Sequence, residues 1–432
     1  MTVDVQLRFG REAITAYSKA NNEPEWALNK RLAAFDASGT LALPHLEKTK
    51  IDKWNIDQFN PFVTEAKVAA ADQLDSVVVE QIDAANVKNL LVQKNASTVF
   101  FAATEELSAQ GVIFTDLATA LVKHGDLVEK YLFTAIPADE HKVAALHAAV
   151  MNGGVFLYVP RNVELAVPVQ AVYEVAGDHS LVAPHVLIVA EANSKVTYVD
   201  SFVSGTGTQM VANSVVEVFV GAGATVQVAS VRSLCDGVHD YSFRRAVVDR
   251  DGKMEWILGE MNDGNTVTNN TTLLKGNGSN ADTKCVSVGR GAQRQNITSM
   301  VQHYGLNSES EMVSKAVMTD EAVTILNGIT KIEKGATKAN GEQANNILML
   351  SEKARGDANP ILLIDEDDVK AGHAASVGRV SEESIYYLMS RGITRRAAER
   401  LIIIGFLDAV ISQIPVEEVR NRVRQALERK LG

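Results

Sequence analysis

Two cysteines are the residues of this chain that could supply a thiol. Cys235 and Cys285 lie far apart in the sequence and form no Cys-x-x-Cys pair. Both fall in a stretch rich in short apolar runs, where a free cysteine is most often a small buried hydrophobic residue. A role in sulfur or metal chemistry therefore has weak support for either residue.

Histidines are the other candidates for chemistry. His239 lies beside Asp236 and Asp240 and could form a weak metal cluster, although an exposed polar loop explains the three residues better. His141 and His147 fall in one expected helix. A spacing of six does not place two ligands on one helical face, so we expect both to be structural.

Several common catalytic motifs are absent from the sequence. Its one Gly-Lys pair, at 252–253, is followed by Met254 and not by the serine or threonine of a phosphate-binding loop. Four Gly-x-Gly triplets lack the third glycine of a dinucleotide loop and indicate turns between strands. No His-Glu-x-x-His and no Gly-x-Ser-x-Gly occurs. If a complex containing this chain hydrolyses ATP, another subunit must hold the phosphates.

Composition narrows the class of protein. The 432 residues are 46% hydrophobic and 22% charged, which is typical of a folded protein of two or three structural units. A formal net charge of −11 argues against binding to nucleic acid or to an anionic membrane surface. The N-terminus has no basic leader followed by an apolar run, and no stretch is long enough to span a membrane. We expect a cytoplasmic protein with reduced thiols.

Three zones follow one another along the chain. To about residue 150 the pattern is mostly helical, with Pro24 at the start of one helix and short strands at 87–92 and 98–101. From about 153 to 365, short runs alternate in period two, and the segments 186–199 and 215–231 share a pattern at an offset of about 30 residues. Many strands without helices between them fit a sandwich or a solenoid, and the approximate repeat favours the solenoid.

From about residue 381 the pattern is helical again. Ser381 is placed as an N-cap, and Arg391 with Gly392 closes the first helix. A second helix carries apolar residues from Leu401 to Ile411. Pro415 opens a third helix with an apolar stripe, which either the chain itself or a partner must cover; its members are Val416, Val419, Val423, Leu427 and Leu431.

Four separated blocks resemble the SufB/SufD family of iron–sulfur cluster assembly proteins. The most specific is DEDDVKAGHAASVGRVSEESIYYLMSRGITRRAAERLIIIGFLDAV at 365–410, which resembles the family's C-terminal signature. The stretches at 111–132 and 141–170 resemble the segment before the β-helical core and the entry into it. EPEWALNKRLAAF at 23–35 is similar to the family's N-terminal helix. The resemblance covers nearly the whole chain in the right order.

Within the family, the chain resembles the SufD type more than the SufB scaffold. SufB-type proteins carry a sulfur-accepting cysteine after a basic pair; here Arg244 and Arg245 are present, but Val248 stands where that thiol would be. A valine cannot form a thiolate or accept a persulfide. Many SufD-type signatures also have a cysteine two residues before the histidine, and this chain has Ala371. His373 remains, and the resemblance implies that it faces the scaffold and is a candidate ligand of iron or of the cluster.

The resemblance and the pattern together predict an α+β protein. We expect a mostly helical region at 1–152, a central right-handed parallel β-helix at 153–370 and a C-terminal helical domain at 371–432. The resemblance implies a non-catalytic subunit that pairs with a SufB-type scaffold through the β-helix. It also implies that the C-terminal helices bind a SufC-type ATPase and that no cofactor is bound by the chain alone, although iron or a cluster could be shared with the scaffold.

Three alternatives stay open. The chain could be the SufB-type scaffold itself, against which Val248 and the His373 block speak. It could be a β-helical carbohydrate-active enzyme, although aromatic residues make up only 6% of the chain. It could also be a structural homodimer.

Overall fold

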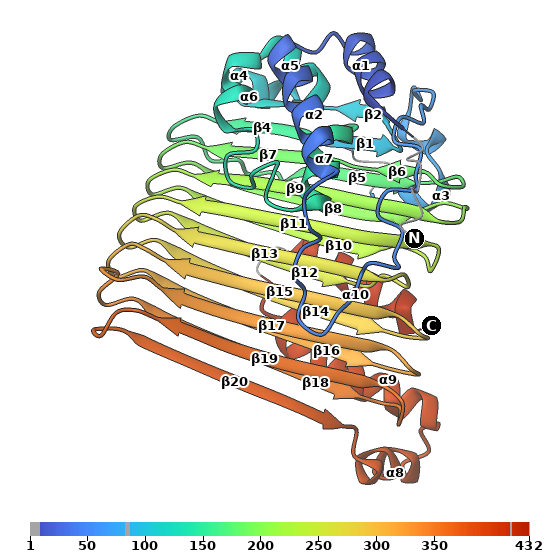
Figure 1. Ribbon diagram of the computed structural model, residues 1–432. Coiled ribbons are helices and arrows are strands. Elements are labelled where there is room, and N and C mark those ends of the chain that lie inside the picture. The colour runs from blue at the N-terminus through green and yellow to red at the C-terminus, as the bar shows by residue number, and fades with distance from the viewer. Residues whose placement is uncertain (1–8, 83–86, 415–416, 432) are drawn as a thin grey trace.

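The computed structural model describes residues 9–82, 87–414 and 417–431. Within these residues the chain folds into two long sheets joined as a solenoid, with helices packed outside them (Figure 1). The N-terminal region contains short helices and three strands: α1 (Arg11–Ala20), α2 (Glu25–Ser38), η1 (Ala71–Gln73), α3 (Ser76–Val79), β1 (Leu90–Lys94), β2 (Ser97–Ala102), α4 (Glu105–Ala109), β3 (Ile113–Asp116), α5 (Leu117–Lys123), α6 (Gly125–Tyr131) and α7 (Lys142–Val150).

The solenoid and the C-terminal helices follow. The strands are β4 (Val155–Val159), β5 (Val169–Val175), β6 (Leu181–Val182), β7 (His185–Ala190), β8 (Lys195–Ser204), β9 (Met210–Val220), β10 (Thr225–Ser233), β11 (Val238–Val248), β12 (Lys253–Glu260), β13 (Thr266–Leu274), β14 (Asn280–Gly289), β15 (Arg294–His303), β16 (Glu309–Met318), β17 (Val323–Ile332), β18 (Asn340–Met349), β19 (Arg355–Ile364) and β20 (Lys370–Arg379). The helices are α8 (Glu382–Ser390), α9 (Arg395–Ile411) and α10 (Glu417–Leu431).

From β7 onward successive strands alternate between the two sheets, so each coil contributes one strand to each. One sheet runs in the order β2-β1-β5-β8-β10-β12-β14-β16-β18-β20. The other runs in the order β19-β17-β15-β13-β11-β9-β7-β4-β3. From β5 and β4 onward all pairs are parallel, and Lys195 on β8 pairs with Thr225 on β10. The repeat of about 30 residues seen in the sequence is therefore one coil, and the solenoid prediction is confirmed over the sandwich.

Stacked turns close the coils at one side. Several of these turns contain a residue in the left-handed region, among them Asn193 (φ 58°), Gly223 (φ 66°) and Asp251 (φ 56°). The N–H of Asn193 donates to the carbonyl of Ala222, and the N–H of Gly223 donates to the carbonyl of Arg250, so the turns bond to one another along the stack. Glycine, asparagine and aspartate tolerate this backbone best, which explains why these residue types separate the apolar runs.

Side chains alternate between the inside of the solenoid and its outer faces. On β10, Val226 and Val228 lie in the internal core, whereas Ala229 and Val231 pack outward against the C-terminal helices. Strands that are buried on both sides in this way read as nearly continuous apolar runs. Burial on the outer side depends on the helices, so the solenoid and its helical covers form one packed unit.

The interior becomes more polar along the solenoid. Near its start, Tyr173 and Tyr198 bond through their hydroxyls at 2.9 Å. Further on lies a fully buried charge cluster, in which Arg232 bonds to Asp240 at 2.5 Å and Arg244 lies 3.6 Å from Glu260. Burial raises the pKa of the Asp240 carboxyl, although Arg232 opposes this. Paired charges of this kind are the form in which ions are tolerated in a core.

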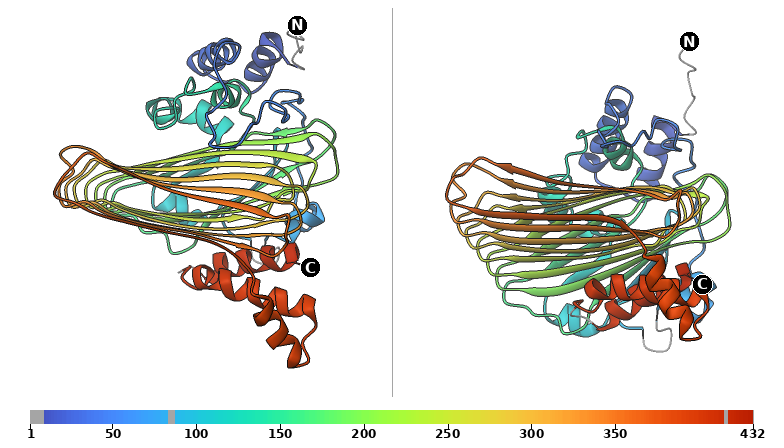
Figure 2. Two further views of the ribbon diagram at one scale, coloured as in Figure 1. Left: turned by 60° about the horizontal axis from the view of Figure 1, so that its bottom comes forward. Right: turned by 90° about the horizontal axis from the view of Figure 1, so that it is seen from below.

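The two helical regions cover opposite outer faces (Figure 2). Residues of α2 and α7 pack with Leu187, Val215 and Phe243 on the outer face of the sheet that ends at β19. Residues of α9 and α10 pack with Ile257, Val286 and Val317 on the outer face of the other sheet. The blue segment in front of the sheet in Figure 1 reaches later coils, where the Asn296 side chain donates to the carbonyl of Glu47 at 3.0 Å.

The helix caps predicted from the sequence are present. Pro24 precedes α2, the Ser381 side chain accepts from the N–H of Ser384, and Gly392 has φ 86° beyond α8. The solenoid extends to Arg379 on β20, about ten residues past the expected start of the helical domain at residue 371. No helix among the described residues is long and apolar enough to cross a membrane.

The apolar stripe of the last helix is covered by the chain itself. Val423 and Leu427 of α10 are buried against the solenoid, and Leu431 packs beside them. Pro415, Val416 and the side chain of Val419 lie outside the described residues. The stripe therefore offers no free apolar surface to a partner at Val423 and Leu427.

Candidate functional site at the open end of the solenoid

The last coil of the solenoid has no further coil stacked on it. β20 ends one sheet and β19 ends the other, and within the described residues each has one neighbouring strand, β18 and β17 respectively. Figure 1 shows both strands at the bottom of the molecule. At the opposite end, Leu107 of α4, Val112 and Phe114 of β3 close the internal core. The solenoid is therefore capped at one end and open at the other.

The free edge of β20 carries a regular row of unpaired backbone groups. The N–H of Lys370 donates to Ala339 and that of Val380 donates to Met349, so even-numbered residues bond inward to β18. Because successive residues of a strand point their N–H groups to opposite sides, odd-numbered residues from Ala371 to Arg379 direct theirs to the free edge. Such an edge is a template for another strand.

The free edge of β19 is interrupted. Odd-numbered residues bond inward here, since Arg355 donates to Ala322 and Asp365 donates to Ile332. Even-numbered residues face the free edge, and Pro360 is one of them. Proline has no N–H, so the row lacks a donor near its middle. Of the two edges, β20 is the more complete template for pairing.

His373 lies at the open end of the solenoid, where the interior between β19 and β20 meets solvent; this opening is called the mouth below. It pairs in register with Gln343 on β18, whose side chain is buried and donates to the carbonyl of Ile361 at 3.0 Å. Residues paired in register on neighbouring strands point to the same side, so His373 faces the interior at its open end. Its imidazole is exposed to solvent. Ala371, two residues earlier, faces the same way and carries no thiol.

Apolar side chains surround this mouth. Ile364 of β19 and Val377 of β20 face the open interior and are 39% and 44% exposed. Leu363 lies on the outer face of β19 and is 46% exposed. Exposed apolar groups beside unpaired strand edges are typical of a surface that another protein covers.

The other predicted candidates do not form a site with His373. His239 lies on β11 and stacks on Trp54 with 5.8 Å between ring centroids, whereas Asp240 points into the interior and bonds to Arg232. The expected polar loop is therefore a strand, and its alternation separates the two residues. His141 accepts from the N–H of Ala144 as the cap of α7, and burial lowers its pKa to about 4. Among the described residues no three His, Cys, Asp or Glu side chains gather as metal ligands.

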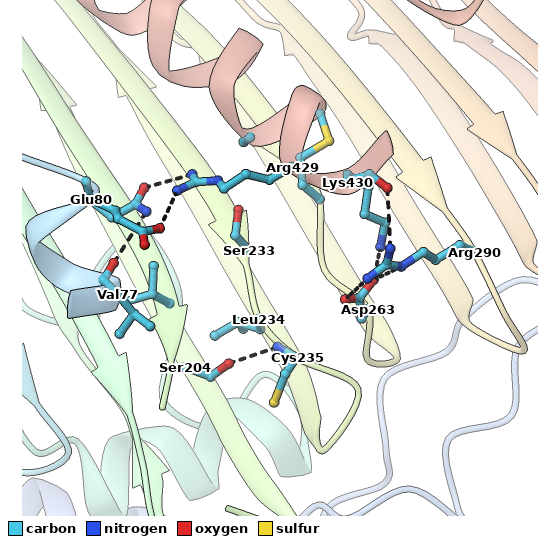
Figure 3. Close-up of a pocket in the computed structure, with 14 residues that line it drawn as sticks. Val77, Glu80, Ser204, Ser233, Leu234, Cys235, Asp263, Arg290, Arg429 and Lys430 are labelled. Carbon is cyan, nitrogen blue, oxygen red and sulfur yellow. Dashed lines mark hydrogen bonds and ion pairs between the residues drawn. The ribbon is translucent and has the colours of Figure 1, made fainter. Parts of the chain in front are cut away.

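A pocket lies between the end of α10, α3 and the C-terminal ends of β10 and β12 (Figure 3). Its basic groups are already paired: Lys430 bonds to Asp263 at 2.5 Å, and Arg290 bonds to the same carboxylate at 2.7 and 2.8 Å. Burial opposes ionisation of Asp263, yet these two cations lower the pKa of its carboxyl. Arg429 lies 3.3 Å from Glu80 near α3. The ion pairs that line the pocket connect α10 to the solenoid and to the N-terminal region.

Comparisons with known proteins agree with the fold. A sequence model described as "SUF system FeS cluster assembly, SufBD core domain" matches residues 173–406. A second, "SufBD protein N-terminal region", matches residues 28–171. The chain is 47% identical over 436 residues to "Iron-sulfur cluster assembly protein SufD" of Bacillus subtilis (strain 168), and the match covers 100% of each chain.

The chain belongs to the SufBD family.

A SufBD family protein of Staphylococcus aureus (strain USA300) is 27% identical over 429 residues, with 96% of this chain and 92% of the relative covered. One of Staphylococcus epidermidis (strain ATCC 12228 / FDA PCI 1200) is 27% identical over 433 residues, covering 97% and 93%. The resemblance noted in the sequence is thus confirmed at the level of the family and of the fold.

In this SufBD protein, the position expected to hold a thiol in scaffold-type members is buried. Val248 points into the interior core and is fully buried. Of the preceding basic pair, Arg244 points inward to Glu260, and Arg245 points outward and bonds to Glu140 at 2.7 Å. A side chain at position 248 is therefore packed by its neighbours and has no contact with solvent.

The free-edge row, Pro360 and the exposed side chains near the mouth were not predicted from the sequence. The period-two series Ala371, His373, Ala375 and Val377 carried the signal for a strand, but the family signature led us to place this stretch with the helices. Which strand is last in a stack depends on the whole chain, so the pattern of one segment does not reveal an edge.

The two cysteines should differ sharply in reactivity. Cys285 is buried in the interior, and burial raises the pKa of its thiol. Little of it is therefore thiolate, and a reagent cannot easily reach it. Cys235 is partly exposed at the pocket. In native protein we expect a colorimetric thiol reagent to modify one thiol quickly, and Cys235→Ser should abolish that phase. Cys285→Ser is the matched control and should leave it intact; a fast phase lost in Cys285→Ser instead would contradict the placement.

Proposed function

We propose that this chain is the SufD-type, non-catalytic subunit of an iron–sulfur cluster assembly complex. It pairs with a SufB-type scaffold through the open end of the solenoid, and it binds a SufC-type ATPase through its C-terminal helices. The single observation that carries the proposal is the open last coil, where a strand edge, exposed apolar groups and His373 lie together.

The open coil supports pairing because a solenoid is stable only when each coil is covered by the next. A terminal coil normally carries a polar cap or a partner, and the described residues provide a cap at the N-terminal end alone. At the other end, three apolar side chains are exposed to water: Val377, Ile364 and Leu363. A partner that buried them would gain roughly 1–2 kcal/mol of binding free energy for each side chain.

Geometry limits how a related partner would attach. If the partner has the same architecture, its N-terminal end is capped as well, so the two solenoids must meet with their open ends together. A half-turn that brings one open end against another reverses the direction of the partner's strands. The strands across the junction would then be antiparallel, unlike the parallel pairs within this chain.

The helix α8 supports binding of the ATPase. Tyr386 and Tyr387 are 74% and 59% exposed, and Met389 beside them is also exposed. Figure 2 shows α8 as the part of the C-terminal helices furthest from the sheets. An exposed cluster of aromatic and methionine side chains is characteristic of protein interfaces. Because α10 is covered by the solenoid, this surface replaces the stripe that the sequence suggested.

The anchoring of α9 and α10 supports a mechanical role. Lys315 of β16 donates to the carbonyl of Phe406 at 2.9 Å, and Lys430 bonds to Asp263. Both helices also bury apolar side chains on the sheet. A nucleotide-dependent movement of an ATPase bound at α8 would therefore move the solenoid with it. The junction at β20 would open or close, with the cluster or iron as the cargo.

His373 is the candidate ligand at that junction. Its exposed imidazole faces the mouth, and the described residues supply no companion ligands, so any shared iron or cluster would take the remaining ligands from the scaffold. The non-catalytic role is supported by Val248 and Ala371, because neither position can carry sulfur.

A proline at the free edge of β20 should weaken pairing without disturbing the solenoid. Ala375→Pro removes one N–H that faces the free edge and leaves every bond to β18 in place. We expect the affinity for the scaffold subunit to fall by up to about tenfold, as the loss of one hydrogen bond implies. Ala375→Val, which keeps the N–H, is the matched control. Equal affinities of the two variants in a titration would exclude β20 as the pairing strand.

Polar substitution on α8 should remove the ATPase alone. Tyr386→Ser with Tyr387→Ser deletes exposed side chains that pack on nothing in the core, so the fold should be unchanged by circular dichroism. We expect loss of the ATPase subunit on size-exclusion chromatography while the scaffold is retained. Truncation after residue 380 is a poorer test, because it would uncover the apolar face beneath α9 and α10. Retention of the ATPase at full affinity would place its binding surface elsewhere.

His373→Ala tests the ligand role. Anaerobic reconstitution of the complex should give less bound iron and sulfide than the wild type, with the subunits still associated. His179→Ala, remote from the mouth, is a control for general loss of histidine. An unchanged cluster yield would remove His373 from the cluster site but leave the pairing intact. A stable cluster on the isolated wild-type chain would instead favour a scaffold role.

A further inference from the structure

A chain of hydrogen bonds joins the N-terminal region to the solenoid where no solvent reaches. His147 of α7, His185 at the start of β7 and Glu217 of β9 are all fully buried. The Nδ1 of His147 lies 2.9 Å from the carbonyl oxygen of Asn213. Its Nε2 lies 3.2 Å from Nδ1 of His185, and Nε2 of His185 lies 3.0 Å from Oε2 of Glu217.

The Glu217 carboxylate is held by the loop between α6 and α7. Its Oε2 accepts from the N–H of Phe133 at 2.7 Å, and its Oε1 accepts from the N–H groups of Ala135 and Ile136 at 2.7 and 2.9 Å. Phe133 takes φ 61° to direct its N–H there, an unusual conformation for an aromatic residue. All three of these groups donate, so both oxygens of the carboxyl group already act as acceptors.

The hydrogen bonds that link Asn213, His147, His185 and Glu217 need more hydrogens than two neutral imidazoles can supply. A backbone carbonyl only accepts, so Nδ1 of His147 must carry a hydrogen. A neutral His147 then has a bare Nε2 and must accept from Nδ1 of His185. A neutral His185 would in turn present a bare Nε2 to Glu217, whose carboxylate also only accepts. Three hydrogen bonds therefore need three hydrogens, and two neutral rings provide two.

We propose that the His147–His185–Glu217 chain binds one additional proton, held as an imidazolium on His185 against the Glu217 carboxylate, and that this proton locks the N-terminal region onto the solenoid. The ligand of this site is the proton itself. The assignment is independent of the proposed function.

The surroundings agree with this assignment. Burial lowers the pKa of His147 well below its usual range, so His147 is the neutral ring. Besides His185, Arg31 of α2 is the charged group that acts on His147, and it is paired with Glu23 at 2.6 Å. The Phe133 ring meets His185 edge-on, with centroids 4.7 Å apart, and shields the pair from water.

His303 and His141 provide matched controls within the same molecule. His303 is equally buried, but both of its ring nitrogens face serine hydroxyls, Ser308 and Ser310, at 2.9 Å. A hydroxyl can donate or accept, so a neutral ring satisfies both bonds. Burial lowers the pKa of His303 to about 4, and that of His141 to about 4.

Nitrogen-15 NMR of the full-length chain, labelled at histidine, reads the protonation of each ring. At pH 8 we expect His185 to show two similar ring-nitrogen shifts, the pattern of an imidazolium. His303 and His141 should show the widely split pattern of neutral rings. Assignment through bonds from the backbone requires no variant to fold. A neutral pattern at His185 under these conditions overturns the proposal.

The pH dependence of unfolding provides a second test. If the folded chain holds a proton that unfolded histidine releases above its ordinary pKa of about 6.5, stability must fall as the pH rises. Over pH 7–9 the equilibrium constant for unfolding in urea should rise up to about tenfold per pH unit more steeply in the wild type than in Glu217→Gln. The glutamine amide can donate to His185, so that variant needs no third proton. Parallel pH profiles for the two proteins would contradict a bound proton.

Discussion

The structure depends on one constraint, that every backbone N–H and C=O of a buried strand must find a partner. In a stacked coil these partners come from the coils above and below, so each strand from β8 to β17 bonds on both edges. The rule has an unavoidable exception at the end of the stack. At the N-terminal end β2 and β3 turn antiparallel and α4 closes the core. At the other end β20 keeps a full row of free donors, the kind of edge with which another strand can pair.

The two outer faces of the solenoid are taken up by the chain's own helices. The N-terminal region covers one face through α2, α7 and the buried histidine chain; α9 and α10 cover the other with Val423 and Leu427. Strands under these covers, such as β9 and β10, are packed on two sides and hydrogen-bonded on two edges, which stiffens the sheets there. Among the described residues, exposed large apolar side chains gather at the open coil and on α8.

Much of this architecture could be read from the residues, and the rest could not for identifiable reasons. The coil length was visible because turn residues such as Asn193 and Gly223 recur at a fixed interval, and the caps at Ser381 and Gly392 were visible because capping is local. The separation of His239 from Asp240 was missed because a strand was taken for a loop, and adjacent residues of a strand face opposite sides. The His147–His185–Glu217 hydrogen bonds connect residues from three separate elements. The need for a third proton depends on that tertiary contact, which no local sequence pattern predicts.

The position of His373 connects these features. It lies on β20, which has a free edge, and its inward direction is fixed by its register partner Gln343 on β18. It is also close in sequence to α8, since β20 ends at Arg379 and α8 begins at Glu382. A displacement of α8 would therefore reach β20 through a connection of only a few residues, while the rigid packing of α9 and α10 would move the sheet as a body. Under the proposed function, local pull on β20 and movement of the whole coil would act at the same junction, where the imidazole of His373 would meet an iron or cluster cargo.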